Sequence, residues 1–212
     1  MNFRSLLIRT HWVLSTQFGL DARAMFFSLT GVRRFIADFK RFRSNYVGPL
    51  EFQPCLHDWN EEGGDARSEY FWQDLIVSRM IYEAKPEKHV DIGSRLDGFI
   101  AHVASFRQIE VFDVRPLTVD IPGVKFKQAD LMEPLKERAN YCDSLSCLHA
   151  LEHFGLGRYG DPVHAEGYKI GFSNMATLLR SGGVFYLSVP VGLGRVIFNA
   201  NRVFDPQQIL EL

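Results

Sequence analysis

From residue 87 onward, short apolar runs alternate with amphipathic segments along the chain. The apolar runs have the length and composition of buried strands, and the amphipathic segments repeat apolar positions every three or four residues, as helices do. The expected strands are residues 88–92, 109–113, 124–127, 142–148 and 183–189. The expected helices are residues 97–105, 166–180 and 206–212. Repeated strand-then-helix units predict an α/β fold with a doubly wound, mainly parallel sheet and helices on its faces.

One connection in this alternation is too short to contain a full helix. Only residues 114–123 separate the second expected strand from the third, and they include Pro116, Pro122 and Gly123. Proline and glycine at this density favour turns. We therefore expect a short, turn-rich crossover between these two strands.

The first 45 residues have the pattern of helices with one apolar face. Asp21 is placed to cap a helix whose apolar residues recur at helical steps: Met25, Phe26, Leu29, Phe35, Ile36, Phe39 and Phe42. The opposite face carries Arg33, Arg34, Lys40, Arg41 and Arg43. A linker rich in glycine and proline precedes a further helix, expected over residues 67–85. The sequence thus predicts a basic helical appendage with its linker over residues 1–66 and an α/β domain over residues 67–212.

Composition and charge restrict the class of function. A hydrophobic content of 46% and a charged content of 23% are ordinary for a soluble globular protein. The net charge of −1 argues against a protein dedicated to binding nucleic acid. Residues 1–50 nevertheless carry eight Lys or Arg against two Asp, a balance of +6. Their basic face is either the solvated side of an appendage or a surface for anionic membrane lipid or a partner protein.

The number and spacing of the cysteines indicate the cellular compartment of the protein. Cys55, Cys142 and Cys147 have no metal-ligand spacing and would leave one thiol unpaired in any disulfide scheme. We therefore expect reduced cysteines and a cytoplasmic location, peripheral to a membrane if the basic helices bind lipid. No apolar run approaches the roughly 20 residues of a membrane span, and Arg9 interrupts the apolar run that a secretory signal would need.

The residues that carry candidate chemistry begin at the first expected strand of the sheet. Residues 90–98 have the pattern of a buried strand that stops at Asp91 and Gly93 and then opens a helix. Asp113 follows at the end of the second expected strand. In a doubly wound sheet, a glycine turn lets the backbone approach a nucleoside, and an acid after the next strand accepts hydrogen bonds from the ribose. The pattern indicates a site for a nucleoside cofactor.

Five segments in this order carry a family resemblance. They are Val-Asp-Ile-Gly at 90–93, Asp113, Gln-Ala-Asp-Leu at 128–131, Leu-His-Ala-Leu-Glu-His at 148–153 and Leu-Leu-Arg-Ser-Gly-Gly-Val at 178–184. Together they resemble a class I S-adenosylmethionine-dependent methyltransferase. More narrowly, residues 86–98, 155–162 and 188–192 resemble an uncharacterised domain-of-unknown-function family of methyltransferase-like proteins. The resemblance implies a Rossmann-like methyltransferase fold and S-adenosylmethionine as the cofactor, and it implies no substrate.

The resemblance also implies roles for the matching positions. The turn formed by Asp91 and Gly93 would lie beside the methionine part of the cofactor. Asp113 would accept hydrogen bonds from both ribose hydroxyls, which are charge-assisted contacts. Asp130 would bind the adenine amino group, and Leu131 would supply a backbone donor. These positions define the expected cofactor site.

Residues at the end of the fourth expected strand would complete the cofactor site, and one residue differs from the family pattern. Cys147 and Leu148 would line the sulfonium. Arg95 stands where the family usually has a second glycine, so its side chain would either crowd the cofactor or hold the methionine carboxylate; we favour the carboxylate. Methyltransferases of this fold normally add two strands after the fifth, whereas this sequence shows five recognisable strands. We therefore expect the last two strands to be absent, which would leave one sheet edge unprotected.

A methyltransferase requires an in-line approach of its acceptor and in some cases a base. His149, Glu152 and His153 follow the fourth expected strand and are the candidates for catalytic residues. If they form a helical turn, the two histidines share one face at a spacing that could also hold a metal. A hard cation would want more carboxylates than this region offers, so we predict no metal. Structural roles for all three side chains are the alternative.

Two loops supply candidates for contacts to the substrate. The loop over residues 154–166 is long for its position, and long loops in compact domains are often functional. We expect a substrate wall from Arg158, Tyr159 and Asp161, with a surface loop ordered by its own contacts as the alternative. After the fifth strand, a phosphate or carboxylate of the acceptor could be received by Arg195, Asn199 and Arg202. Ordinary solvent-exposed charge is the alternative there.

These features predict an S-adenosylmethionine-dependent methyltransferase that acts on a small molecule or glycan precursor, at an oxygen atom. A nicotinamide-dependent dehydrogenase would share the turn and the ribose acid, but Gly-x-Gly-x-x-Gly and Tyr-x-x-x-Lys are missing. An RNA methyltransferase suits the short crossover but not the near-neutral charge. The non-enzymatic alternative is a degenerate domain that serves as a partner or scaffold protein, which Arg95 and the missing strands favour. The oligomeric state stays open.

Overall fold

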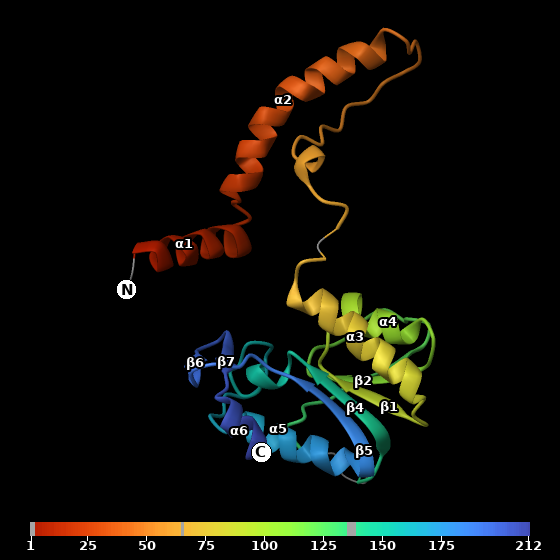
Figure 1. Cartoon of the computed structure of the whole chain (residues 1–212), viewed down its shortest axis with the longest axis vertical. Helices are drawn as coiled ribbons and strands as arrows, with labels where there is room; N and C mark the ends of the chain where they lie inside the picture. The colour runs from red at the N-terminus through yellow and green to blue at the C-terminus, as the bar shows by residue number, and fades with distance from the viewer. Residues whose placement is uncertain (1–2, 65, 135–138) are drawn as a thin grey trace. The chain divides into compact units, whose positions relative to one another are not determined.

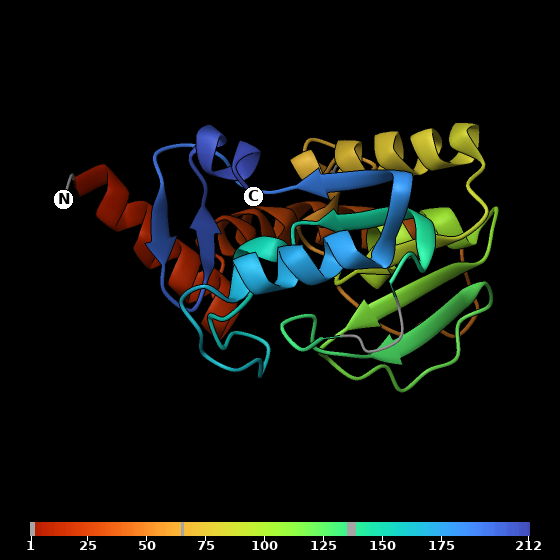
Figure 2. The same ribbon diagram turned by 90° about the horizontal axis from the view of Figure 1, so that it is seen from below.

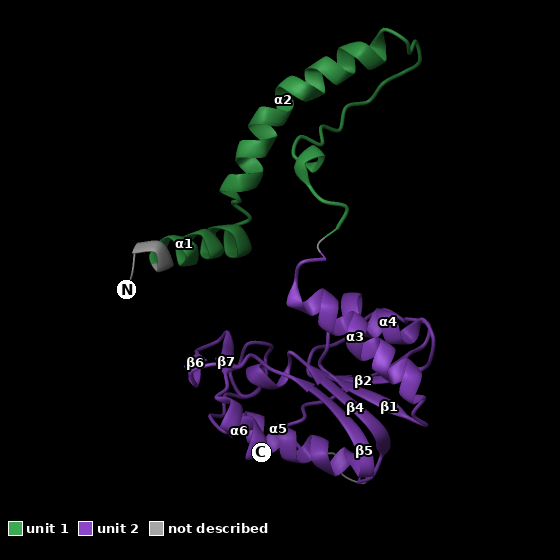
Figure 3. Ribbon diagram, viewed as in Figure 1, with its two compact units in different colours: residues 1–65 green, residues 66–212 purple. Residues whose placement is uncertain are grey.

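The computed structural model of the chain describes residues 3–64, 66–134 and 139–212 (Figure 1). The chain divides into two compact units, residues 1–65 and residues 66–212 (Figure 3). This division lies one residue before the boundary expected from the sequence. Each unit is built around its own internal contacts and is described separately.

Unit 1 contains two helices and an extended segment that returns along the second helix (Figure 1). Its elements are α1 (Phe3–Phe18), α2 (Ala22–Arg43) and the 3-10 turn η1 (Asp58–Asn60). Asp21 caps α2 as predicted, because its Oδ1 accepts hydrogen bonds from the amides of Arg23 and Ala24 at 2.8 and 3.0 Å. The returning segment lies against α2 at Gly31, where an added Cβ would overlap the carbonyl oxygen of Leu56. Among the described residues, no helix is both long enough and apolar enough to cross a membrane.

Unit 2 contains the predicted α/β sheet. Its elements are α3 (Glu69–Ala84), β1 (His89–Ile92), η2 (Leu96–Ile100), α4 (Ala101–Ala104), β2 (Ile109–Asp113), β3 (Val124–Gln128), β4 (Cys142–Leu148), η3 (Leu151–His153), α5 (Gly167–Leu178), β5 (Leu179–Ser188), β6 (Arg195–Ile197), β7 (Asn201–Val203) and α6 (Pro206–Leu210). β1 to β5 form one sheet in the order β3-β2-β1-β4-β5, and every neighbouring pair is parallel. This order confirms the doubly wound, Rossmann-like methyltransferase fold. The crossover over residues 114–123 contains no helix, as predicted.

Helices cover both faces of this sheet (Figures 1 and 2). On one face, α3 and α4 pack through residues such as Ile81 and Val103 against strand residues that include Val111. On the other face, α5 packs through Met175 against residues that include Phe112. Val111 and Phe112 are neighbours in β2 and point to opposite faces, as the period of two in a strand requires. With both faces covered, the carboxyl ends of the strands are the open side of the sheet.

Two helices differ from the expectation. The predicted helix over residues 97–105 begins with a wide π-type turn, η2, because Gly98 leaves helical backbone angles (φ −132°, ψ −108°). The predicted helix over residues 166–180 ends two residues early, at Leu178. Leu179 starts β5 instead, because its backbone pairs with Cys142 of β4. The spacing of apolar residues could not predict this pairing, because the pairing depends on the position of the neighbouring strand.

An antiparallel hairpin that was not predicted follows β5. β6 and β7 pair with each other and lie outside the five-stranded sheet, to which the described residues add no sixth strand. The turn of the hairpin holds Asn199 in the left-handed region (φ 57°), which asparagine tolerates better than most residues. Strands of three residues are too short to show an alternating pattern. α6 lies within the predicted residues 206–212, and Asp205 caps it.

Candidate functional site

A cavity of about 410 Å³ opens at the carboxyl ends of the parallel strands. The sheet order changes direction between β1 and β4, and doubly wound sheets bind ligands in the crevice at this switch point. Gly93 and His149 follow these two strands and both line the cavity. The cavity also contains most of the side chains singled out from the sequence, which are Arg95, Asp113, Asp130, Leu131, Leu148, Glu152, His153, Arg158, Tyr159 and Asp161.

The turn after β1 is held by a buried carboxylate. Asp91 is fully buried and accepts hydrogen bonds from Ser94 N (3.0 Å), Ser94 Oγ (2.7 Å) and Ser146 Oγ (2.5 Å). Burial raises the pKa of Asp91 to about 6, and the hydrogen bonds from Ser146 and Ser94 oppose this rise. Gly93 has φ +71°, and an added Cβ would lie 3.0 Å from the Cβ of Ala150. Asp91 therefore holds the turn through hydrogen bonds on its buried side. Gly93 has no side chain, so a ligand in the cavity can approach its backbone closely.

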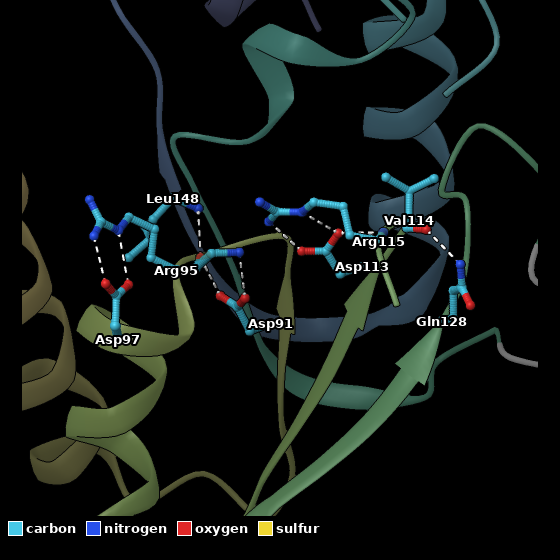
Figure 4. Close-up of polar contacts among 9 residues, drawn as sticks. Asp91, Arg95, Asp97, Asp113, Val114, Arg115, Gln128 and Leu148 are labelled. Atoms are coloured by element: carbon cyan, nitrogen blue, oxygen red, sulfur yellow. Dashed lines mark hydrogen bonds and ion pairs between the residues drawn. The ribbon is translucent and has the colours of Figure 1, made fainter. Parts of the chain in front are cut away.

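Asp113, the predicted ribose acid, is paired with an arginine two residues further on. Its Oδ1 accepts hydrogen bonds from the backbone amide and Nε of Arg115 at 2.8 and 3.0 Å, and its Oδ2 accepts one from Nη2 at 2.6 Å (Figure 4). The hydrogen bond to Asp113 raises the pKa of Arg115. The Arg115 guanidinium also lies over the ring of Tyr159, 4.6 Å from its centroid. The Asp113 carboxylate, at the end of β2, thus lines the cavity while it is paired with Arg115.

The residues after β3 form a turn beside this pair. Asp130 Oδ1 accepts a hydrogen bond from the amide of Met132 at 2.8 Å. The carbonyl of Leu131 accepts one from Asn174 Nδ2 at 2.8 Å, while its side chain is buried. Asp130 and Leu131 both line the cavity, on the same strand-end edge as Asp113. Their position is compatible with the predicted contact to a base.

Arg95 and Cys147 occupy different surroundings from those the sequence suggested. Arg95 Nε and Nη2 donate hydrogen bonds to the carboxylate of Asp97 at 3.0 and 2.7 Å, and the Arg95 side chain is largely exposed at the cavity edge (Figure 4). Cys147 is fully buried in the core, and burial raises the pKa of its thiol well above the usual value. The next residue, Leu148, is the one that lines the cavity. Alternation along β4 turns Cys147 away, because neighbouring strand residues face opposite sides.

A buried carboxylate lies between two histidines after β4. Glu152 Oε1 lies 3.5 Å from His149 Nδ1 and 3.8 Å from His153 Nε2. Glu152 is 2% exposed, and neither its Oε2 nor His149 Nδ1 has a hydrogen-bond partner among the described residues. The ring of Tyr70, from α3, lies against His149 with the centroids 4.4 Å apart and the ring planes inclined by 51°. His153 Nδ1 contacts the carbonyl of Ala200 at 2.6 Å and must donate there, since a carbonyl only accepts.

The conformation of this segment corrects one expectation. Residues 149–153 are not one helical turn: the 3-10 turn η3 covers only Leu151–His153, and His149 precedes it with φ +53°. His149 and His153 nevertheless converge on Glu152, so their grouping comes from the bend rather than from helical spacing. Burial is the main cause of a lowered pKa for His153. The neutral form of this histidine is therefore favoured.

The long loop after η3 is ordered from within by Asp161. Its Oδ2 accepts hydrogen bonds from the amides of Gly155 and Gly157 at 2.9 and 3.2 Å, and its Oδ1 accepts one from the amide of Tyr159 at 3.1 Å. Arg158 donates to the carbonyl of Ala200 at 3.0 Å. The loop places Tyr159 at the cavity wall, and the carboxylate of Asp161 is used to hold the loop.

The three predicted substrate residues after β5 lie elsewhere. Arg202 is buried rather than exposed, and it donates hydrogen bonds to the carbonyls of Glu152, Phe154 and Ala165. Arg195 is exposed and donates to the carbonyl of Leu193, while Asn199 forms the hairpin turn. None of Arg195, Asn199 and Arg202 lines the described cavity. Arg202 instead ties the hairpin to η3 and to the long loop.

Three polar side chains are among the cavity residues that the sequence interpretation missed. Gln73 and Asp74 reach the cavity from α3, and Arg115 reaches it from the crossover. Burial raises the pKa of Asp74. A polar pair on the buried side of a helix is a signal that could have identified Gln73 and Asp74, whereas nothing in the sequence indicates that Arg115 turns back onto Asp113.

Comparisons with known proteins found one family model and several solved structures. The model of a family described as "Caenorhabditis protein of unknown function, DUF268" matches residues 123–210, which is less than half of the chain. The chain is similar to an O-methyltransferase family protein from Burkholderia thailandensis, with 14% identity, a TM-score of 0.47, and coverage of 65% of this chain and 47% of that one. No curated protein sequence matches the chain.

Two further solved structures show the range of the similarity. One is the Burkholderia thailandensis 1,6-didemethyltoxoflavin-N1-methyltransferase with bound S-adenosylhomocysteine, at 19% identity and a TM-score of 0.47, covering 72% of this chain and 66% of that one. The other is the cyclase SpnF, at 18% identity and a TM-score of 0.49, covering 70% and 58%. The chain thus spans about half to two thirds of the length of these three proteins. These similarities assign no activity to it.

Proposed function

We propose that unit 2 binds S-adenosylmethionine and transfers its methyl group to an oxygen atom of a small molecule or glycan precursor. The observation that carries the proposal is the position of the cavity, at the switch point of a β3-β2-β1-β4-β5 sheet, with a glycine turn after β1 and an acid at the end of β2. The volume of about 410 Å³ is that of a small-molecule site.

The residues of the cavity fit an adenosyl group. Asp113 offers a carboxylate for two hydroxyl donors, Gly93 offers close approach of backbone, and the turn at Asp130 and Leu131 offers contacts for a base edge. When bound, the cofactor supplies a methyl group attached to a positively charged sulfur. The chain supplies position and exclusion of water, which are the main requirements for such a transfer.

Glu152 and His149 supply a candidate for proton removal. The buried Glu152 carboxylate faces His149 Nδ1 at 3.5 Å, and an anion there favours the tautomer that carries its proton on Nδ1. The remaining ring nitrogen, Nε2, is then the basic one. Glu152 would also stabilise the charged ring after it accepts a proton, in the way that a buried carboxylate supports a histidine base. We assign His149 as the base and Glu152 as the residue that positions it.

The cofactor assignment is tested by calorimetric titration of the whole chain with S-adenosylhomocysteine. We expect micromolar binding in wild type and an affinity about 30-fold lower in Asp113→Ala. The variant loses two charge-assisted hydrogen bonds to the ribose, and this loss is partly offset because the ion pair with Arg115 no longer has to break. Asp120→Ala, an exposed acid in the same crossover, is the matched control. Equal affinity in Asp113→Ala and wild type would refute the site assignment.

The base assignment is tested once an acceptor is found. His149→Gln should abolish turnover and leave the affinity for S-adenosylhomocysteine within about twofold, because we assign the ring to the acceptor and not to the cofactor. Full turnover in His149→Gln would exclude His149 as the base.

A second function is favoured by one observation, the pairing of Arg115 with Asp113. If this pair does not open, the ribose acid stays occupied and the domain serves as a partner or scaffold protein without cofactor. Absence of binding at millimolar S-adenosylhomocysteine in wild type, with binding restored in Arg115→Ala, is the result that would select this function.

A further inference from the structure

Helix α2 of unit 1 has one broad apolar face, and only part of it is packed. Phe39, on this face, contacts Phe52 of the returning segment, with the ring centroids 5.1 Å apart. Met25, Leu29, Val32 and Ile36 continue the face toward the start of the helix, at steps of four, three and four residues, and all four are exposed. Steps of three and four place residues in one row along a helix. We call this row of four residues the α2 stripe.

Helix α1 adds exposed apolar surface to the same unit. Leu7, Trp12 and Phe18 are each more than half exposed. The helix contains no Asp or Glu, and its described side chains include Arg9. The α2 stripe itself is a contiguous apolar row, and contiguous exposed apolar surface on a folded unit marks an interaction site.

Basic residues flank the α2 stripe. Arg33 lies four residues after Leu29, and Lys40 lies four residues after Ile36, so each basic side chain neighbours the row on the helix surface. Arg33 and Lys40 are both exposed. An apolar row bordered by cations matches an apolar interior bordered by anions, which is the chemistry of an anionic membrane surface.

The acids within α1, α2 and the turn between them do not cancel the charge of these helices. Residues 1–50 contain only Asp21 and Asp38 against eight Lys or Arg. Asp21 is engaged as the cap of α2, and hydrogen bonds from the amides of Ala24 and Arg23 lower its pKa. Asp38 is paired with Arg34 at 3.4 Å. Neither acid is therefore paired with Arg33 or Lys40, the cations beside the stripe.

We propose that the α2 stripe and its flanking cations dock unit 1 on an anionic lipid bilayer, lying in the interface rather than crossing it. A second copy of the chain is a poorer occupant, because self-association through this face would bring Arg33 and Lys40 of one copy close to the same cations of the other. A lipid surface accepts the apolar row and neutralises the cations at once. The docking is independent of the cofactor site.

The test is co-sedimentation of the full chain with vesicles of phosphatidylcholine alone or with 30% phosphatidylserine, as a function of salt. We expect binding only to the anionic vesicles, and its loss at high salt, because screening shortens the range of surface charges. Arg33→Ala combined with Lys40→Ala should weaken binding about 30-fold, at about 1 kcal/mol for each cation. Arg79→Ala combined with Lys125→Ala, the same change of charge in unit 2, should have no effect.

The apolar contribution is tested separately. Leu29→Ser combined with Ile36→Ser should weaken binding at least tenfold, and circular dichroism should be unchanged, because both side chains are exposed. Equal binding to neutral and anionic vesicles would overturn the proposal, as would no binding to either. Sedimentation equilibrium identifies the other occupant: a dimer that the serine variant dissociates would show that this face joins two copies of the chain.

Discussion

The contact between Asp113 and Arg115 predicts that the chain holds its own cofactor site partly closed. A ribose that binds Asp113 competes with the two guanidinium hydrogen bonds from Arg115, whereas the backbone amide of Arg115 can stay in place. Arg115→Ala keeps the backbone amide and removes the two guanidinium contacts. The variant should therefore bind S-adenosylhomocysteine more tightly than wild type does.

The magnitude follows from the exposure of the pair. The Arg115 side chain is 44% exposed, whereas that of Asp113 is 11% exposed. An ion pair with one partner this exposed contributes about 0.5–1 kcal/mol, because water screens it and two side chains lose freedom. Removing it should lower the dissociation constant by roughly two- to fivefold.

The assay is isothermal titration calorimetry at two salt concentrations. The advantage of the variant should shrink at high salt, where the ion pair in wild type is already weakened. Arg79→Ala, a remote exposed arginine on α3 that is paired with Glu83, controls for the change of net charge. Weaker binding in Arg115→Ala would refute the reasoning, because it would mean that Arg115 holds the cofactor instead of competing with it.

Three further predictions concern the turn, the hairpin and the buried acid. Gly93→Ala should lose about 1–2 kcal/mol of stability and most cofactor affinity, whereas Gly160→Ala, which has φ +85° but open space, should lose only stability; urea unfolding and calorimetry separate the two. Arg202→Met should cost about 3 kcal/mol in urea unfolding, because buried carbonyls lose their donor, and Arg195→Met should cost under about 0.5 kcal/mol. The pKa of about 6 for Asp91 means that the native state keeps a proton that the unfolded chain has lost. This contribution to stability is present below about pH 4 and disappears as pH rises through about 6, by about 3 kcal/mol, so Asp91→Asn should remove it.

The pH prediction is a difference between variant and wild type, because a second buried group acts in the opposite direction. Burial lowers the pKa of His89 to about 3, so its contribution to stability is lost as pH falls from about 6.5 toward 3. His89 is present in both proteins and cancels in the comparison. If the stability of Asp91→Asn, relative to wild type, were the same at pH 4.5 and pH 7, the raised pKa of Asp91 would be wrong.

The sheet was predictable because its signals are local. The two central strands are buried runs, since β1 is buried at all four positions and β4 at six of seven. The order of motifs then fixed which strand carries Gly93 and which carries Asp113. The short crossover was also predictable, since ten residues with two prolines hold no full helix.

The missed features depend on contacts between distant segments. The hairpin of β6 and β7 consists of two three-residue strands, and its stability comes from Arg202, which reaches carbonyls of the segment around residues 152–165. A surface arginine and a buried one look alike in a sequence. The pairing of Arg115 with Asp113 and the convergence of His149 on Glu152 are likewise set by backbone bends, which residue types do not encode.

The most direct measurement is a crystal structure of the whole chain with S-adenosylhomocysteine. The account predicts electron density in the cavity between β1 and β4, with the ribose hydroxyls within hydrogen-bond distance of the Asp113 carboxylate and the guanidinium of Arg115 displaced from it. Ligand bound elsewhere on the chain, or bound here with Arg115 still paired to Asp113, would contradict the account.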